Sequence, residues 1–295
     1  MDRVMTSINI WVAGARPRTL PAALAPILAG AASARYAGRV DWLLTLLALV
    51  VAAALQIGVN YANDYSDGVR GTDEDRSGPL RITASGLARP EHVRRAAFLS
   101  FGVAAVVGLA IVAAIGQWWL LLVGVASILA AWYYTGGAHP YGYMGLGEVF
   151  VFIFFGLVAT VGTTYVSVLG APAHAWWAGT AVGAMACAVL VGNNLRDIPT
   201  DRETGKRTLA VRLGDRGTRW FYAGLAVLAA ASIVSFAALT TWFALVALLG
   251  LAVLGQPLRL VLGGATGRAL IPVIQGTGMA GVGIGLGLLV GVFVA

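Results

Sequence analysis

The stretch that decides the fold runs from Trp42 to Asp67 and reads WLLTLLALVVAAALQIGVNYANDYSD. Its first part, Trp42–Val59, carries no charged residue, and an α-helix needs about 20 apolar residues to cross the hydrocarbon core of a bilayer. Its last part is rich in Asn and Asp. The stretch therefore predicts a membrane-spanning helix that ends in a cluster of polar side chains.

The composition extends this interpretation to the whole chain. Of the 295 residues, 59% are hydrophobic and only 11% are charged, and the mean hydropathy is +0.81. A soluble domain carries about 25% charged residues, so this chain lacks the polar surface that a soluble fold needs. Its one cysteine, Cys187, excludes a disulfide within the chain.

Nine apolar stretches are long enough to span a membrane. We therefore expect an all-α, multi-pass protein of nine transmembrane helices in a single domain, residues 1–295, with long charged connections at residues 66–92 and 197–219. The predicted spans are Thr19–Tyr36, Trp42–Tyr65, Val93–Ile115, Trp118–Thr135, Gly145–Leu169, Ala175–Leu195, Trp220–Leu239, Trp242–Leu262 and Leu270–Val294.

The basic residues predict the orientation. The net charge is +7, which in a soluble protein would suggest a nucleic-acid partner. Here, however, all 20 Lys and Arg residues except Arg35 and Arg39 fall on the same predicted side of the bundle as the N-terminus. Because basic residues concentrate on the cytoplasmic side of membrane proteins, we expect an N-in, C-out protein of the plasma membrane, surrounded by lipid and without a nucleic-acid partner.

An acidic motif closes the second span. Asn60 and Asp64 are four residues apart, and Asp64 and Asp67 are three apart. These three side chains share one face if the helix continues through them. Asp73 follows in the connection.

A similar motif closes the sixth span. Asn193, Asp197 and Asp201 repeat at a spacing of four residues, again one face of a helix. Pro199 either ends that helix or begins a new segment, which leaves the position of Asp201 open. Because the second and sixth spans run in the same direction, both motifs lie at the cytoplasmic end of the bundle.

The two motifs together predict a Mg²⁺-diphosphate site. Carboxylate and amide oxygens suit Mg²⁺, which keeps several waters and binds substrate phosphates through a few carboxylates. Basic side chains suit the diphosphate itself, although membrane orientation alone would also place basic residues here. The predicted metal ligands are Asn60, Asp64, Asp67, Asp73, Asp197 and Asp201, and the predicted diphosphate contacts are Arg70, Arg81, Arg196, Lys206, Arg207, Asn60 and Asn193.

These residues resemble the UbiA superfamily of intramembrane prenyltransferases. That superfamily carries an Asn-Asp-x-x-Asp motif after its second helix and an Asp-x-x-x-Asp motif after its sixth. Asn63-Asp-Tyr-Ser-Asp67 matches the first motif, and Asp197-Ile-Pro-Thr-Asp201 matches the second. The resemblance covers essentially the whole chain.

Three further stretches are similar to the branch called MenA, the 1,4-dihydroxy-2-naphthoate polyprenyltransferases. They are Arg16-Pro-Arg-Thr-Leu20, the extended motif Asn63–Asp73, and Tyr134-Thr-Gly-Gly137 followed by Gly145-Leu-Gly-Glu148. The 4-hydroxybenzoate branch usually places a third acid four residues after the second, whereas here Asp73 follows Asp67 by six. A departure from the MenA pattern is Ala138-His139-Pro140, where a proline-led turn is expected, so the role of that loop stays open.

The resemblance implies a helical bundle around a central cavity, open sideways to the membrane, in which two Mg²⁺ ions hold a polyprenyl diphosphate between the motifs. It implies transfer of the prenyl chain to 1,4-dihydroxy-2-naphthoate with loss of CO₂, which gives a demethylmenaquinol for menaquinone biosynthesis. The catalytic residues would be Asp64, Asp67, Asp197, Asp201, Lys206 and Tyr134, and the acceptor would bind at Arg18, Glu148 and Tyr134.

Two kinds of alternative remain open from the sequence. Another UbiA-type enzyme would use a hydroxybenzoate, haem or sugar-phosphate acceptor. A cation-coupled transporter would use the acids as an ion site, but such sites tend to lie near the middle of the membrane, whereas these acids cluster at one predicted face.

Overall fold

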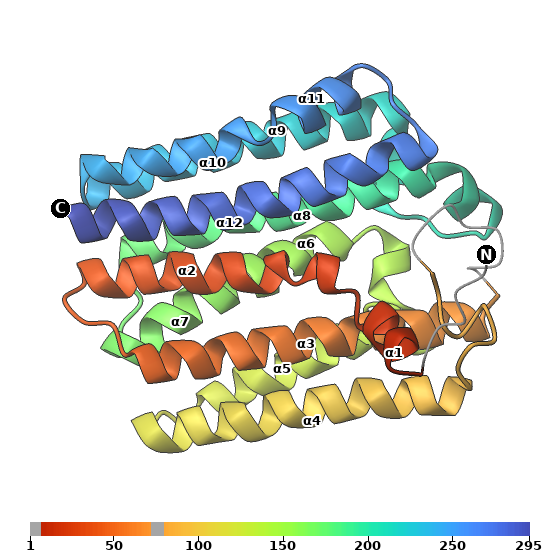
Figure 1. Ribbon diagram of the computed structural model, residues 1–295, viewed down its shortest axis with the longest axis horizontal. Helices are drawn as coiled ribbons and strands as arrows, with labels where there is room; N and C mark the ends of the chain where they lie inside the picture. The colour runs from red at the N-terminus through yellow and green to blue at the C-terminus, as the bar shows by residue number, and fades with distance from the viewer. Residues whose placement is uncertain (1–6, 72–79) are drawn as a thin grey trace.

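The structure is a computed structural model that describes residues 7–71 and 80–295, and every regular element within these two ranges is a helix. The long helices lie side by side along a common direction (Figure 1). The α-helices are α1 Ser7–Ala15, α2 Pro21–Tyr36, α3 Trp42–Val69, α4 Pro90–Ile115, α5 Leu120–Tyr133, α6 Gly147–Val151, α7 Ala159–Val168, α8 Ala173–Glu203, α9 Leu209–Leu239, α10 Leu248–Ala252, α11 Gly255–Leu262 and α12 Ile271–Val294.

Each predicted span is helical, but the spans differ in length. In the described residues, six helices are long and apolar enough to cross a membrane, and a pair bent by 50°, Trp242–Ala252 with Gly255–Leu262, would add a seventh. Two predicted spans are short, since α2 has 16 residues and α5 has 14. The structure therefore gives an all-helical fold with six or seven candidate spans, while the count of nine and the N-in, C-out orientation stay predictions.

The two helices that carry the acidic motifs are longer than their predicted spans. α3 continues through its motif to Val69, and α8 continues through Pro199 to Glu203. The expected long connection 197–219 is wrong, because only residues 204–208 separate α8 from α9. Apolar residues mark only the part of a helix that lies in lipid, whereas the hydrogen bonds within the helix persist equally well beyond it.

Small residues let the helices of the bundle approach closely. α12 packs against both α2 and α8, and a Cβ atom added to Gly285 would lie only 2.6 Å from the Ala25 carbonyl oxygen of α2. A Cβ added to Gly156 would lie 2.6 Å from the Cα of Gly183 in α8. Such contacts are the usual means of helix association in membranes, and they explain the high glycine content.

The ends of the helices bring the two motifs to one end of the molecule. α3 and α8 both finish at the end of the bundle where α1 lies, and the C-terminus lies at the opposite end (Figure 1). α3 begins at an N-cap, Asp41, whose carboxylate accepts a hydrogen bond from the Leu44 N–H at 3.0 Å. The expected convergence of the motifs thus follows from the direction of these two helices.

Candidate active site

The first acidic motif lies in the last turns of α3. Asp64 is fully buried, and its carboxylate accepts hydrogen bonds from the backbone N–H groups of Ile82 at 3.0 Å and Thr83 at 2.8 Å. The Arg16 Nη2 atom lies 3.9 Å from the same carboxylate. Asp64 therefore holds two other segments, residues 80–83 and the α1–α2 connection, against the end of α3.

Asp67 is the residue at which the two motifs meet. Its Oδ1 atom accepts a hydrogen bond from the phenol of Tyr143 and lies 3.6 Å from Lys206 Nζ. Its Oδ2 atom lies 3.4 Å from Arg81 Nη2. Asp67, Arg81 and Lys206 are all buried, so a carboxylate of the first motif is neutralised by a lysine that follows the second.

The second motif lies in the last turns of α8. Arg196 donates two hydrogen bonds to its neighbour Asp197, at 2.7 and 2.8 Å. Asp201 accepts a hydrogen bond from the Thr208 hydroxyl at 3.5 Å, and its carbonyl accepts one from the Lys206 N–H at 2.8 Å. This turn after α8 aims Lys206 back toward α3.

Tyr143 is a site residue that the sequence did not single out. Its ring lies 4.5 Å from Lys206 Nζ and 5.5 Å from the Arg70 guanidinium, measured to the ring centroid. Its carbonyl accepts a hydrogen bond from the Arg207 N–H at 2.9 Å. Tyr143 therefore ties the α5–α6 connection to both motifs, and cations over its ring are stabilised by the aromatic face.

The position of Tyr143 has only a weak signal in the sequence. It belongs to a short 3₁₀ turn, Tyr141–Met144, that follows Pro140 and ends at Gly145 with a φ of 77°. Burial raises the pKa of the neighbouring Tyr141 phenol, which donates a hydrogen bond to the Ala130 carbonyl at 2.7 Å. The sequence signal that could have identified Tyr143 is a turn rich in aromatic residues, predicted on the same side of the membrane as both motifs.

Glu148, at the start of α6, has an unusual environment. Only 5% of its surface is exposed, and its Oε1 atom accepts a hydrogen bond from Asn194 of α8 at 2.9 Å. Its Oε2 atom is buried and has no hydrogen-bond partner within residues 7–71 and 80–295. A buried carboxylate oxygen without a partner is costly, which makes this atom a candidate to bind a ligand.

Tyr134, the other predicted acceptor contact, lies beside this glutamate. A Cβ atom added to Gly147 would lie 3.5 Å from the Tyr134 hydroxyl. The hydroxyl therefore lies next to Gly147, the residue that precedes Glu148 in the chain. The Tyr134 ring packs edge-on against Tyr141, with their centroids 5.5 Å apart. The structure thus brings together the two predicted residues of the Tyr134–Glu148 stretch.

Several predicted residues have other partners. Asn60 donates hydrogen bonds to the Ala15 carbonyl and the Thr19 hydroxyl, both at 2.8 Å, so its amide clamps the α1–α2 connection onto α3. Asn193 donates to the Val189 carbonyl of its own helix at 3.3 Å. These contacts do not test the predicted binding roles of Asn60 and Asn193, which stay predictions.

The predicted basic contacts also divide into groups. Arg70 donates hydrogen bonds to the carbonyls of Thr135 and Gly137, and thereby fastens the end of α5 to α3. The side chains of Arg18 and Arg207 are exposed, whereas Arg16, two residues before Arg18, reaches Asp64. The predicted ligand Asp73 lies outside the described residues.

The donor set suits a hard divalent cation. The four motif aspartates are all buried at this end of the bundle, and their oxygens are the ligands that Mg²⁺ prefers. In the described part of the chain no three His, Cys, Asp or Glu side chains form a ready-made metal cluster. Mg²⁺ does not need one, because it commonly binds through one or two carboxylates together with substrate phosphates.

Comparison with known proteins identifies the family. A profile described as the UbiA prenyltransferase family matches residues 23–269. The chain belongs to this family. It is 50% identical over 285 residues to the 1,4-dihydroxy-2-naphthoate octaprenyltransferase of Mycobacterium tuberculosis, with 94% of each chain covered. It is 40% identical over 260 residues to the enzyme of the same name from Escherichia coli, with 83% of each covered.

Solved structures of UbiA homologues share the fold. The apo structure of a homologue from Aeropyrum pernix matches with a TM-score of 0.70 at 14% identity, over 90% of this chain and 96% of that one. A homologue from Archaeoglobus fulgidus bound to DMAPP and Mg²⁺ matches with a TM-score of 0.65 at 12% identity, over 95% and 99%. These structures show that the fold is shared. The family profile and the relative from M. tuberculosis confirm the resemblance to the UbiA superfamily, and the chain is a prenyltransferase by family.

Proposed function

We propose that this chain transfers a polyprenyl group from polyprenyl diphosphate to 1,4-dihydroxy-2-naphthoate, with loss of CO₂, in menaquinone biosynthesis. The observation that carries the proposal is the contact of 3.6 Å between Asp67 and Lys206, which joins the two acidic motifs into one buried charged site. The relatives from M. tuberculosis and E. coli, which are named for this acceptor, support the choice of substrate.

Two groups of residues would bind the diphosphate of the donor. Lys206, Arg81 and Arg196 are buried cations beside the motif aspartates, and they would bind the diphosphate and stabilise the negative charge that develops as it leaves. The motif aspartates would hold two Mg²⁺ ions, which supply further charge stabilisation for the diphosphate when bound. The Mg²⁺ in the A. fulgidus homologue supports this metal for the family.

The acceptor would lie between the aromatic residues and Glu148. The unpartnered Oε2 atom of Glu148 is suited to accept a hydrogen bond from a hydroxyl of the naphthoate. The rings of Tyr134 and Tyr143 would stabilise positive charge on the allylic carbon. The carbon–oxygen bond to diphosphate breaks, the carboxyl-bearing ring carbon forms the new carbon–carbon bond, and CO₂ leaves its electron pair in the ring, so no added base is required.

The proposal includes the place of the enzyme in the cell. Nine spans around a central cavity, with the N-terminus inside and the C-terminus outside, would put both motifs at the cytoplasmic face of the plasma membrane. The distribution of Lys and Arg supports this orientation. The lipid bilayer would then deliver the apolar donor, and the cytoplasm would deliver the naphthoate, with no nucleic acid involved.

The test is a reconstituted reaction with a long-chain polyprenyl diphosphate and dihydroxynaphthoate, followed by mass detection of the prenylated quinol and of CO₂. We expect product with Mg²⁺, none after chelation, and recovery when Mg²⁺ is restored. Asp64→Asn and Asp197→Asn should each lower turnover by at least about a hundredfold. The matched control is Asp215→Asn, because Asp215 is an exposed carboxylate on α9 that pairs with Arg219 four residues later.

Other outcomes would reject the proposal in different ways. Product from a hydroxybenzoate, with none from the naphthoate, would keep the prenyltransferase and replace the acceptor. Cation flux into liposomes without any prenylated product would favour a transporter instead. Near-normal turnover in Asp64→Asn or Asp197→Asn would remove that residue from the site.

A further inference from the structure

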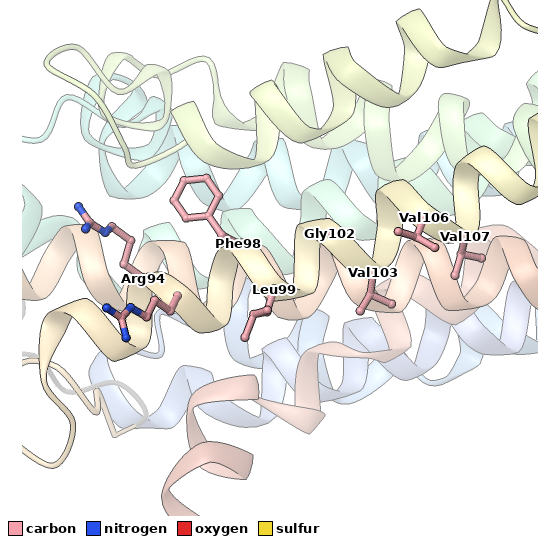
Figure 2. Close-up of a pocket in the computed structure, with 8 residues that line it drawn as sticks. Arg94, Phe98, Leu99, Gly102, Val103, Val106 and Val107 are labelled. Carbon is pink, nitrogen blue, oxygen red and sulfur yellow. The ribbon is translucent and has the colours of Figure 1, made fainter.

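α4 lies at the edge of the bundle (Figure 1). Side chains along this helix line a hollow on the surface. The hollow is a shallow groove of about 850 Å³ that is largely open to its surroundings. Figure 2 shows that its side chains follow one another along a single helix, with the charged groups at one end. The lining residues are Arg94, Arg95, Phe98, Leu99, Gly102, Val103, Val106 and Val107.

The groove reaches well into the membrane. At a rise of 1.5 Å per residue, the distance from Arg95 to Val107 is about 18 Å along α4, or over half of the hydrocarbon thickness of about 30 Å. Leu99 is 72% exposed and Val106 is 70% exposed. Between them, the surface over Gly102 is open, since a Cβ atom added there would meet no atom within 4 Å.

The charged end of the groove carries more positive than negative charge. Arg89, Arg94 and Arg95 are exposed, and within the described residues none of them has a carboxylate within ion-pair distance. The Arg94 guanidinium lies over the Tyr65 ring at 5.8 Å. Arg89 is the N-cap of α4, and Arg94 and Arg95 follow in its first two turns, where the backbone dipole disfavours cations. Glu91 is the acidic residue of the first turn, so this end of the groove keeps a net positive charge that an anionic group would balance.

We propose that the groove binds an anionic phospholipid. The lipid phosphate would accept hydrogen bonds from Arg94 and Arg95, and one acyl chain would lie over Gly102 between Leu99 and Val106. A ligand with one charged head and one long apolar chain matches this lining along its whole length.

The lining argues for a lipid rather than for the prenyl donor. Every lining residue comes from α4, and none comes from α8 or from the 3₁₀ turn that carries Tyr143. The diphosphate of the donor must reach Asp67 and Lys206, which are buried. A separate amphiphile with its head at the surface fits the groove without entering that site.

The experiment is native mass spectrometry of the full chain, titrated with phosphatidylglycerol in a detergent that contains excess phosphatidylcholine. We expect the wild type to retain one tightly bound phosphatidylglycerol. The double variant Arg94→Gln/Arg95→Gln should bind it about thirtyfold more weakly, because each basic residue near the leaflet contributes to attraction of anionic lipid. Gly102→Leu should also weaken binding, since it fills the groove without altering charge.

The matched control is Arg259→Gln/Arg268→Gln, which removes the same charge from two exposed arginines elsewhere on the predicted cytoplasmic side. Equal losses of affinity in the control and the α4 variant, or unchanged binding in Gly102→Leu, would mean that phosphatidylglycerol is attracted by the overall positive charge of the protein and not by the groove. Either result would overturn the proposal. Displacement of the bound phosphatidylglycerol by polyprenyl diphosphate, with a raised donor KM in Arg94→Gln/Arg95→Gln, would assign the groove to the donor and equally overturn it. Thermal unfolding of each variant checks that the fold is retained.

Discussion

The two acidic motifs have similar sequences but different surroundings. The carboxylates at the end of α3 bind partners from distant parts of the chain: Asp64 binds backbone N–H groups at residues 82 and 83, and Asp67 meets Tyr143 and Lys206. At the end of α8, by contrast, Asp197 pairs with the adjacent Arg196, and Asp201 with Thr208 seven residues later.

This difference separates two functions of the carboxylates. The motif of α3 assembles the site, because its partners come from the α1–α2, α3–α4, α5–α6 and α8–α9 connections. In the motif of α8, these hydrogen bonds stay within one short segment. Substitutions in the α3 motif should therefore lower activity by disturbing the arrangement of the site. Substitution of Asp197 in the α8 motif should lower the free energy of unfolding, because the buried Arg196 loses its carboxylate partner.

The largest effect is expected for Asp67→Asn. The amide keeps the shape of the carboxylate and can still accept the hydrogen bond from Tyr143, but it no longer neutralises Lys206 and Arg81, and it is a poor Mg²⁺ ligand. We expect kcat to fall about a thousandfold, at the upper end of the effect of removing one electrostatic group. The measurement is Mg²⁺-dependent product formation, with Asp215→Asn as the control. A loss of less than tenfold would show that Asp67 does not act in catalysis.

The next effect concerns stability at the end of α8. Asp197→Ala leaves the Arg196 guanidinium buried without its bidentate partner, and breaking a buried ion pair in this way costs about 3 kcal/mol or more. Denaturant unfolding of the Asp197→Ala variant in detergent measures this loss of stability.

A double variant sharpens this result. In Arg196→Met/Asp197→Leu the buried pair is replaced by apolar side chains, so much of the stability lost in Asp197→Ala should return. If the double variant is as unstable as Asp197→Ala, the cost comes from packing around α8 rather than from the unpaired charge of Arg196.

The sequence was sufficient for the features that depend on local pattern. The apolar stretches predicted where helices lie, and the spacing of Asp64 and Asp67 predicted a shared face, because both depend on the geometry of a single helix. The continuation of α8 through Pro199 was left open, since the missing hydrogen bond at a proline is tolerated or not according to its neighbours.

The sequence was insufficient for partners far apart along the chain. Asn60 was predicted as a ligand because it shares a face with Asp64, and the sequence did not show that its amide also binds the α1–α2 connection. Arg18 was predicted to contact the acceptor and Arg16 was given no role, but Arg18 is exposed and Arg16 lies 3.9 Å from Asp64. Tyr143 gave no periodic signal, because its position depends on how the α5–α6 turn packs against α3 and on the residues after α8.

The smallest effect is expected for Tyr143→Phe, which tests the link between the two motifs directly. The variant loses the hydrogen bond to Asp67 but keeps the ring beneath Lys206 and Arg70. A hydrogen bond to a charged group contributes about 1.5 kcal/mol or more, so kcat should fall about tenfold. Tyr143→Leu also removes the ring face and should lower kcat further.

If Tyr143→Phe and Tyr143→Leu are equally impaired, the ring contributes nothing to holding the cations. If both are fully active, Asp67 and Lys206 keep their positions without the α5–α6 turn, and the assembly of the site depends on the helix ends alone.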